Sequence, residues 1–162
     1  MTRPFRFGLQ AYSSSTPSDW RELAKKTEDL GFSSFHLADH YVGEGPALEA
    51  ANHPLQNLAA LPAMTVAAEA TESIRIGCRV LCCDYHEPVV LAKEVATIDW
   101  FSEGRLELGL GAGWIQSEYE AMGIPMMSPG KRIDKMLETL DLIRQHYSLS
   151  LIHISEPTRL TM

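Results

Sequence analysis

The chain has 162 residues, enough for one domain with its own core, since domains mostly run to about 100–150 residues. Its net charge of −7, from 21 acidic and 14 scattered basic residues, argues against a nucleic-acid-binding protein. No apolar run approaches the roughly 20 residues of a membrane span. We therefore expect a cytoplasmic protein whose clustered cysteines are reduced thiols, not a disulfide framework.

In its first half the chain predicts alternating strands and helices. Thr16 can cap a helix, Pro17 suits the first helical position, and Gly31 suits the position just after the helix end. In chain order we expect a strand over 5–10, a helix from 16 to 30, a strand over 33–38, a polar loop over 39–54 and an alanine-rich helix over 55–71.

The second half continues the alternation. We expect a strand over 74–82, a helix that Glu87-Pro88 opens and that runs to about 101, a strand over 105–111 and a helix over about 131–147. The buried stripe of this last helix is predicted to be Ile133, Met136, Leu137, Leu140 and Ile143. Such regular alternation is typical of a parallel sheet covered by helices, and both a doubly wound sheet and a barrel fit it. Four units make half of an eight-unit barrel, which typically needs about 250 residues.

Functional groups are expected where the strands end, because ligands of parallel β/α folds bind at the carboxyl ends of the strands. Asp39 and His40 follow the second strand, and this pair is the sharpest local signal. An imidazole can take or give a proton near neutral pH, and a neighbouring carboxylate can hold it in one tautomer. The alternative is a helix cap beside a partly exposed histidine.

The fourth strand ends in glycines, at residues 109–113, which would let the backbone approach a phosphate or a ring closely. Pro125 and Pro129 delay the next helix, which excludes a dinucleotide-binding fingerprint, and a tight turn remains the alternative. Adjacent Cys82 and Cys83 would point to opposite faces of a strand, so we expect no metal site.

The last residues differ in character from the rest. From 149 to 159 the sequence reads LSLIHISEPTR, which resembles the translation of a common transposase sequencing adapter. We therefore expect residues 149–162 to be a non-native tail and residues 1–148 to be the native domain. The alternative is a fifth strand over 149–154, ended by Pro157.

A longer segment carries a family resemblance. Residues 74–114, IRIGCRVLCCDYHEPVVLAKEVATIDWFSEGRLELGLGAGW, resemble the core signature of the bacterial luciferase-like superfamily, and the match extends from Phe5 to about Tyr147. Within it, RPFRFGLQ, CCDYHEP and LGLGAGWIQSEYEAMGIP look like an actinobacterial-type subgroup of deazaflavin-dependent oxidoreductases. The resemblance implies an α/β fold, the TIM (β/α)8 barrel of the bacterial luciferase-like type, with only the first four β/α units present in this chain.

The resemblance also implies roles for individual residues. Asp39 and His40 would be catalytic, with His40 facing the reactive ring. The cofactor-binding set would include a non-prolyl cis peptide under the ring at Arg79–Val80. The remaining cofactor-binding positions would be Cys82, Cys83 and Asp84 along the cofactor edge and Gly111, Ala112 and Gly113 beside the ring.

One position departs from the pattern. Deazaflavin sugar-phosphate dehydrogenases of this superfamily place a catalytic Glu directly after the glycine-rich strand, where this chain has Trp114. That puts sugar-phosphate oxidation in doubt. Glu118 is nearby but matches a different, general family position.

The resemblance thus implies an oxidoreductase that transfers hydride between coenzyme F-420 and a small organic substrate. The first alternative is an FMN-dependent monooxygenase that uses O2. A second is that the chain as given is an inactive half-barrel, because it leaves two open sheet edges and lacks half of the cofactor site. We expect the full-length parent to be a homodimer with no nucleic-acid or membrane partner.

Overall fold

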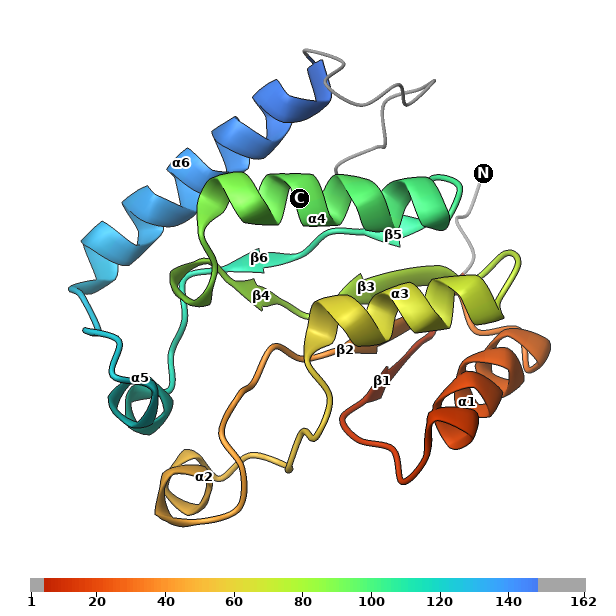
Figure 1. Ribbon diagram of the computed structural model, residues 1–162, viewed down its shortest axis with the longest axis horizontal. Helices are drawn as coiled ribbons and strands as arrows, with labels where there is room; N and C mark the ends of the chain where they lie inside the picture. Colours follow the sequence, from red (N-terminus) through yellow and green to blue (C-terminus); the bar gives the residue numbers. More distant parts are fainter. Residues whose placement is uncertain (1–4, 149–162) are drawn as a thin grey trace.

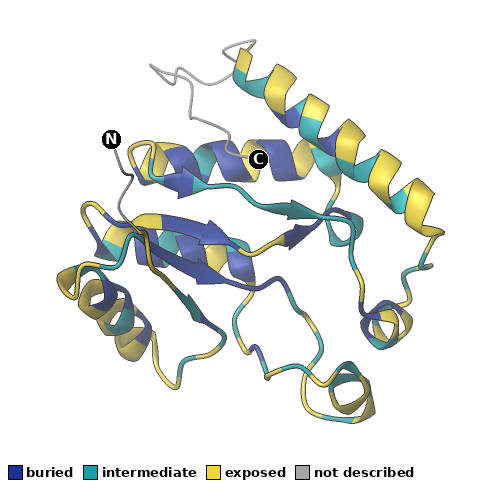
Figure 2. Cartoon of the chain, turned by 180° about the vertical axis from the view of Figure 1, so that it is seen from behind, coloured by how far each residue is buried: buried dark blue, intermediate teal, exposed yellow. Residues whose placement is uncertain are grey.

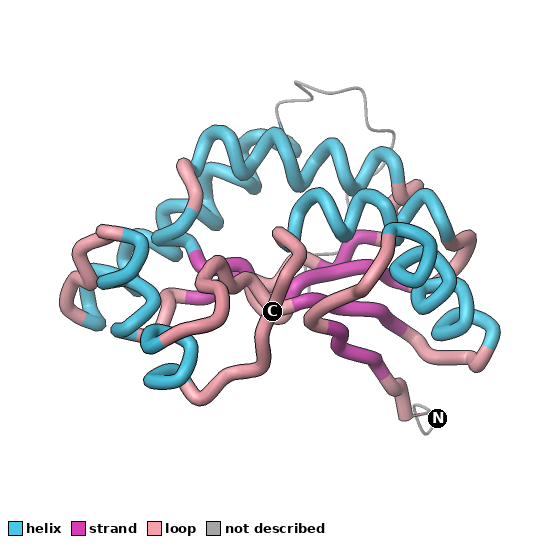
Figure 3. Tube along the Cα trace, turned by 60° about the horizontal axis from the view of Figure 1, so that its bottom comes forward, coloured by secondary structure: helices cyan, strands magenta, loops and turns pink. Residues whose placement is uncertain are grey.

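The computed structural model describes residues 5–148 and shows a parallel sheet with helices along one face (Figures 1 and 3). Both readings of the last segment, tail and fifth strand, fall on residues outside this range. The elements, in chain order, are β1 (Gly8–Ala11), α1 (Pro17–Asp29), β2 (Ser34–Leu37), α2 (Pro46–Ala51), α3 (Ala60–Ala70), β3 (Arg75–Cys78), β4 (Leu81–Cys82), the 3-10 turn η1 (Cys83–Tyr85), α4 (Pro88–Phe101), β5 (Leu106–Glu107), β6 (Leu110–Gly111), α5 (Gln116–Met122) and α6 (Pro129–Ser148).

The strands pair in the order in which the chain makes them. β1, β2, β3 and β5 form one parallel sheet, and β4 and β6 form a parallel pair that extends β3 and β5 toward their carboxyl ends. The predicted strands over 74–82 and 105–111 are each divided in two, the former at Arg79–Val80. This sequential order with helical crossovers is the arrangement of a barrel built one β/α unit at a time.

The first helix begins and ends as its sequence predicts. The Thr16 side chain accepts a hydrogen bond from the Asp19 backbone N–H at 3.1 Å, and Pro17 opens the helix. Gly31 has a φ of 79°, the left-handed conformation that ends many helices and that glycine adopts without steric penalty. The local capping prediction is confirmed.

A single apolar core lies between the sheet and the helices (Figure 2). In β2, Phe35 and Leu37 are fully buried beneath α1 and α3, whereas His36 points to the opposite face of the sheet, beside Gly77. Glu107 on that face is paired with Arg6 at 2.8 Å. One sheet face is therefore apolar and covered by helices, and the other is polar, as the alternation of side chains along a strand requires.

Two predictions for the connecting segments are wrong. The expected loop over 39–54 contains α2, and the glycine- and proline-rich segment before α6 contains α5. Both helices are short and lie at the carboxyl ends of the strands (Figure 1). There the Ser117 hydroxyl on α5 donates to the Ala47 carbonyl on α2 at 2.8 Å. Helices this short depend on tertiary contacts, which a sequence pattern does not reveal.

The predicted buried stripe of α6 is also partly wrong. Ile143 is buried, but Ile133 and Leu137 are 46% and 49% exposed, while Thr139 is buried. The Thr139 hydroxyl donates to the Lys135 carbonyl at 2.8 Å, so its own helix satisfies it and it can face α4 and η1. A pattern based on hydrophobicity alone therefore misplaced the packed face.

Candidate active site

A cleft of about 90 Å³ lies at the carboxyl ends of the strands. The predicted site residues that line it come from separate strand ends: Asp39, His40, Arg79, Val80, Cys82, Gly111 and Gly113. Its other lining residues were not predicted as site residues: Tyr85, Trp114, Ile115 and Glu118. The predicted Cys83, Asp84 and Ala112 do not line it. The cleft is smaller than the roughly 300–1,000 Å³ of common small-molecule sites.

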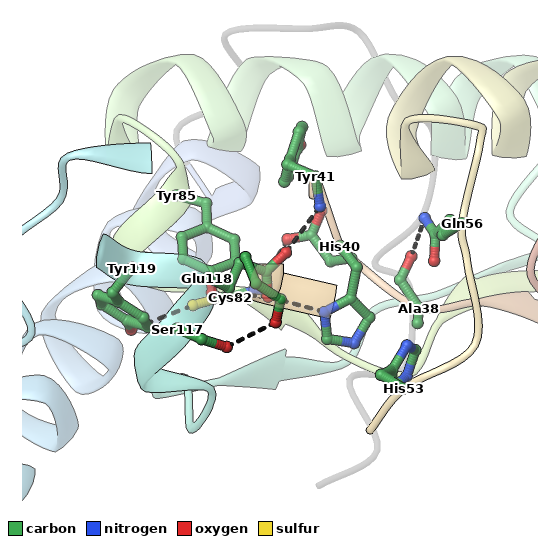
Figure 4. Close-up of polar contacts among 12 residues, drawn as sticks. Ala38, His40, Tyr41, His53, Gln56, Cys82, Tyr85, Ser117, Glu118 and Tyr119 are labelled. Carbon is green, nitrogen blue, oxygen red and sulfur yellow. Dashed lines mark hydrogen bonds and ion pairs between the residues drawn. The ribbon is translucent and has the colours of Figure 1, made fainter. Parts of the chain in front are cut away.

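His40 is held by Glu118, not by its neighbour Asp39 (Figure 4). Its Nδ1 lies 2.8 Å from Oε2 of Glu118, whose side chain is fully buried. The other carboxylate oxygen accepts the Tyr41 backbone N–H at 2.7 Å, and Oε2 also accepts the Tyr85 hydroxyl at 3.1 Å. Burial raises the pKa of Glu118, but the hydrogen bonds from His40 and from the Tyr41 backbone outweigh it, and the pKa is lowered.

Asp39 binds a different set of groups. Its Oδ2 accepts the Cys82 backbone N–H at 2.8 Å and lies 2.8 Å from Nε2 of His86. The Asp39 side chain is fully buried, and the His86 side chain is 9% exposed. Asp39 therefore joins the end of β2 to β4 and to the turn that follows it.

His53, in the loop after α2, packs against His40 with its ring tilted by 48° to that of His40. The two ring centroids are 3.9 Å apart, and His53 Nδ1 donates to the Pro54 carbonyl at 2.8 Å. Burial lowers the pKa of His53, which favours its neutral form beside His40. Figure 4 shows the two rings adjacent, with Glu118 on the opposite side of His40.

Val80 forms the exposed apolar surface of the cleft. The Arg79–Val80 peptide bond is cis, as the resemblance implied, and Val80 is 44% exposed. A Cβ added at Gly111 would lie 2.4 Å from Cγ2 of Val80, and one at Gly109 would lie 2.8 Å from Cγ1. The glycines of the fourth strand thus make room for the Val80 side chain.

Gly113 allows another close approach. With φ at 73°, it lies so near Tyr119 that an added Cβ would be 1.9 Å from the phenol oxygen. That phenol is fully buried and donates to Asp84 at 2.8 Å, and Asp84 also pairs with Lys135 at 3.2 Å. The predicted cofactor residue Asp84 therefore supports the glycine-rich turn from behind the cleft.

The cysteines of this region are buried thiols. Burial raises the pKa of Cys82, and it raises that of Cys83 to about 11, so both stay protonated at neutral pH. Only Cys82 lines the cleft, since Cys83 lies in the turn η1 and faces α6 beside Thr139. Within residues 5–148, no group of three or more His, Cys, Asp or Glu side chains is arranged to hold a metal ion.

Sequence reasoning missed much of the contact network of His40. Glu118, Tyr85, His53 and His86 reach the site from other elements, and Glu118 is 78 positions from His40. The only available signal for Glu118 was its match to a general family position. In the part of the chain that the structure describes, no helix is long and apolar enough to cross a membrane.

Comparison with known proteins agrees with this architecture. The F420-dependent glucose-6-phosphate dehydrogenase of Amycolatopsis mediterranei is 32% identical over 130 residues, which are 80% of this chain and 37% of that protein. Limonene 1,2-monooxygenase of Rhodococcus erythropolis is 30% identical over 124 residues, 76% of this chain and 29% of that protein. The chain spans about half or less of the length of the curated relatives it matches.

A solved structure shows the same fold. An F420-dependent secondary alcohol dehydrogenase in complex with an F420-acetone adduct superposes with a TM-score of 0.71 at 24% identity, over 97% of this chain and 44% of that one. The parallel sheet described above corresponds to about the first half of such luciferase-like TIM barrels. The family model for luciferase-like monooxygenases matches residues 1–149. The chain therefore belongs to the luciferase-like monooxygenase family.

Proposed function

We propose that this chain carries one wall of the active site of an oxidoreductase that transfers hydride between coenzyme F-420 and a small organic substrate. The observation that carries the proposal is the setting of His40. Glu118 occupies its Nδ1, and no described group bonds its Nε2, which leaves that nitrogen for the cleft that His40 lines. A carboxylate-held imidazole with one free nitrogen can accept a proton from a substrate.

The residues present fit one face of a flat ring. Val80 offers an exposed apolar surface, and Gly111 and Gly113 border it without side chains of their own. When bound, a deazaflavin supplies two-electron chemistry by accepting or donating hydride. The other wall would come from chain beyond the half-barrel, because the solved relative is more than twice as long as the part matched here.

His40 would supply the proton step. When an alcohol-type substrate is oxidised, hydride leaves carbon and a proton leaves oxygen, and Nε2 of His40 accepts that proton. The reverse reaction returns it. Trp114 is 66% exposed at the cleft and replaces the Glu that the sugar-phosphate dehydrogenases carry, which favours a substrate other than a sugar phosphate.

A titration of the chain with F-420 and, separately, with FMN tests the proposal through quenching of cofactor fluorescence. We expect the chain to bind F-420 at least about tenfold more tightly than FMN, a difference of about 1.4 kcal/mol. His40→Ala should bind F-420 with nearly unchanged affinity, because the proposal gives the imidazole a role in proton transfer and none in binding the deazaflavin ring. Preference for FMN would favour the alternative of an O2-dependent monooxygenase. Binding of neither cofactor would reject the proposal for this chain and favour the inactive half-barrel.

A further inference from the structure

The hydrogen bonds of Glu118 determine which nitrogen of the His40 ring carries the hydrogen. The Tyr41 backbone N–H can only donate a hydrogen bond, and it lies 2.7 Å from Oε1. The Tyr85 hydroxyl donates to Oε2 at 3.1 Å. Both oxygens therefore accept hydrogen bonds, and because these contacts lower the pKa of Glu118, its ionised form is favoured.

The tautomer of His40 follows from this. An ionised carboxylate cannot donate, so the nitrogen 2.8 Å from Oε2 must carry the hydrogen of that contact. We propose that Glu118 is a positioning residue that holds the hydrogen of His40 on Nδ1 and turns the lone pair of Nε2 toward the cleft. The value of that lone pair for proton transfer rests on the proposed function, but the tautomer itself does not.

The fold holds Glu118 rigidly in this place. Its neighbour Ser117 is bonded to the Ala47 carbonyl of α2, and its other neighbour, Tyr119, is fully buried and bonded to Asp84. α5 is therefore anchored on both sides of Glu118. A short helix held at adjacent residues presents the carboxylate to His40 with little freedom to move.

The ring of His40 is restricted from its other side as well. The tilted ring of His53 packs against it, and the Nδ1–H of His53 donates to the Pro54 carbonyl. Asp39, the adjacent carboxylate, contacts Cys82 and His86 through Oδ2, and no described hydrogen bond joins it to the ring of His40. Among the ionisable groups of residues 5–148, Glu118 is the one hydrogen-bonded to the ring of His40.

The test is an ¹⁵N NMR measurement of the imidazole nitrogens of His40 in the full chain, at a pH where the ring is neutral. Hydrogen on Nδ1 and a bare Nε2 are expected in the wild type. Hydrogen on Nε2 would overturn the proposal, whatever happens to any variant. Failure to bind F-420 with the Nδ1–H tautomer intact would reject the proposed function alone.

Two variants sharpen the test. Glu118→Gln introduces an amide that can donate as well as accept, so the Nδ1–H population should fall several-fold. Glu120→Gln, on the same helix but exposed, should leave the tautomer unchanged. An unchanged tautomer in folded Glu118→Gln would contradict the proposal, and if that variant does not fold, the wild-type spectrum decides.

Discussion

The Asp39 carboxylate pairs with His86, 47 positions away, and not with the adjacent His40. The same oxygen accepts the Cys82 backbone N–H, so one buried carboxylate joins the end of β2 to β4 and to the residue that follows η1. This arrangement places Asp39 in the wall of the cleft, and the proposed function gives the proton step to His40 alone.

Replacing Asp39 should therefore destabilise the fold. Asp39→Asn keeps an oxygen for the Cys82 N–H but removes the charge that His86 contacts. We expect the free energy of unfolding in urea to fall by roughly 1–3 kcal/mol, the usual cost of disrupting a buried polar contact. Asp29→Asn, at an exposed position, should change it by less than about 0.5 kcal/mol. Equal effects of the two variants would contradict the role given to Asp39.

The lowered pKa of Glu28 predicts that the stability of the fold depends on pH in the acid range. Burial acts to raise its pKa, but the backbone N–H groups of Ser73, Ile74 and Glu72 lower it from 4.5 to about 2. A carboxyl with a lowered folded pKa stabilises the protein above its unfolded pKa, and this stabilisation is lost as the pH falls from about 4.5 to about 2.

Glu28→Gln should accordingly lower the urea midpoint at pH 7, and the difference from wild type should shrink as the pH falls through that window. Glu22→Gln provides the control, since its only described contact is an exposed one with Ser18 at 3.4 Å. A difference that stays constant with pH would show that ionised Glu28 contributes nothing through these bonds.

Alanine substitutions at Gly113 and Gly123 distinguish the cost of backbone strain from the cost of a steric clash. Both have positive φ, 73° and 69°, but an added Cβ at Gly123 meets nothing within 4 Å. Gly123→Ala should cost about 1–2 kcal/mol for the left-handed backbone alone. Gly113→Ala should cost roughly 1–3 kcal/mol more, because its methyl group meets Tyr119. Thermal unfolding of both variants measures the difference, and equal losses would contradict the predicted clash.

Arg105 ties the opposite end of the sheet together. Its guanidinium donates to Ser102, Thr71, Ile74 and Ala68, with distances from 2.7 to 3.1 Å. Lysine keeps the charge but lacks the planar set of donors, so Arg105→Lys should lower the free energy of unfolding by about 2–3 kcal/mol. Arg21→Lys, which loses one exposed bond to Pro17, should have little effect in the same urea titration. If Arg105→Lys loses as little stability as Arg21→Lys, the hydrogen bonds of the Arg105 guanidinium do not stabilise this end of the sheet.

The regular elements could be predicted because their signals are local. Thr16, Pro17 and Gly31 act within a few residues of the helix ends that they define. The positions of Asp39 and His40 at a strand end followed from the β/α alternation. The partners of these two residues, His86 for Asp39 and Glu118 for His40, did not follow from it. Neighbouring residues of an extended chain point in opposite directions and so reach different partners.

The contacts within the site depend on the assembled fold. Glu118 reaches His40 only because α5, a seven-residue helix that the pattern did not reveal, docks on α2. Cys83 and Asp84 were expected at the cofactor edge, but the turn η1 carries them behind the cleft. Where the chain leaves regular structure, strand periodicity no longer tells which way a side chain faces.

Under the proposed function, F-420 would bind in the cleft beside His40. Backbone amide signals in ¹H–¹⁵N spectra, followed while F-420 is added to the chain, locate the binding site. We expect the shifts to concentrate at Val80, Gly111 and Gly113. The apolar pocket of about 350 Å³ between α1 and α3, which Ala63 and Val66 help to line, should stay unchanged. Shifts confined to that pocket, or no shifts at saturating F-420, would rule out binding of F-420 beside His40.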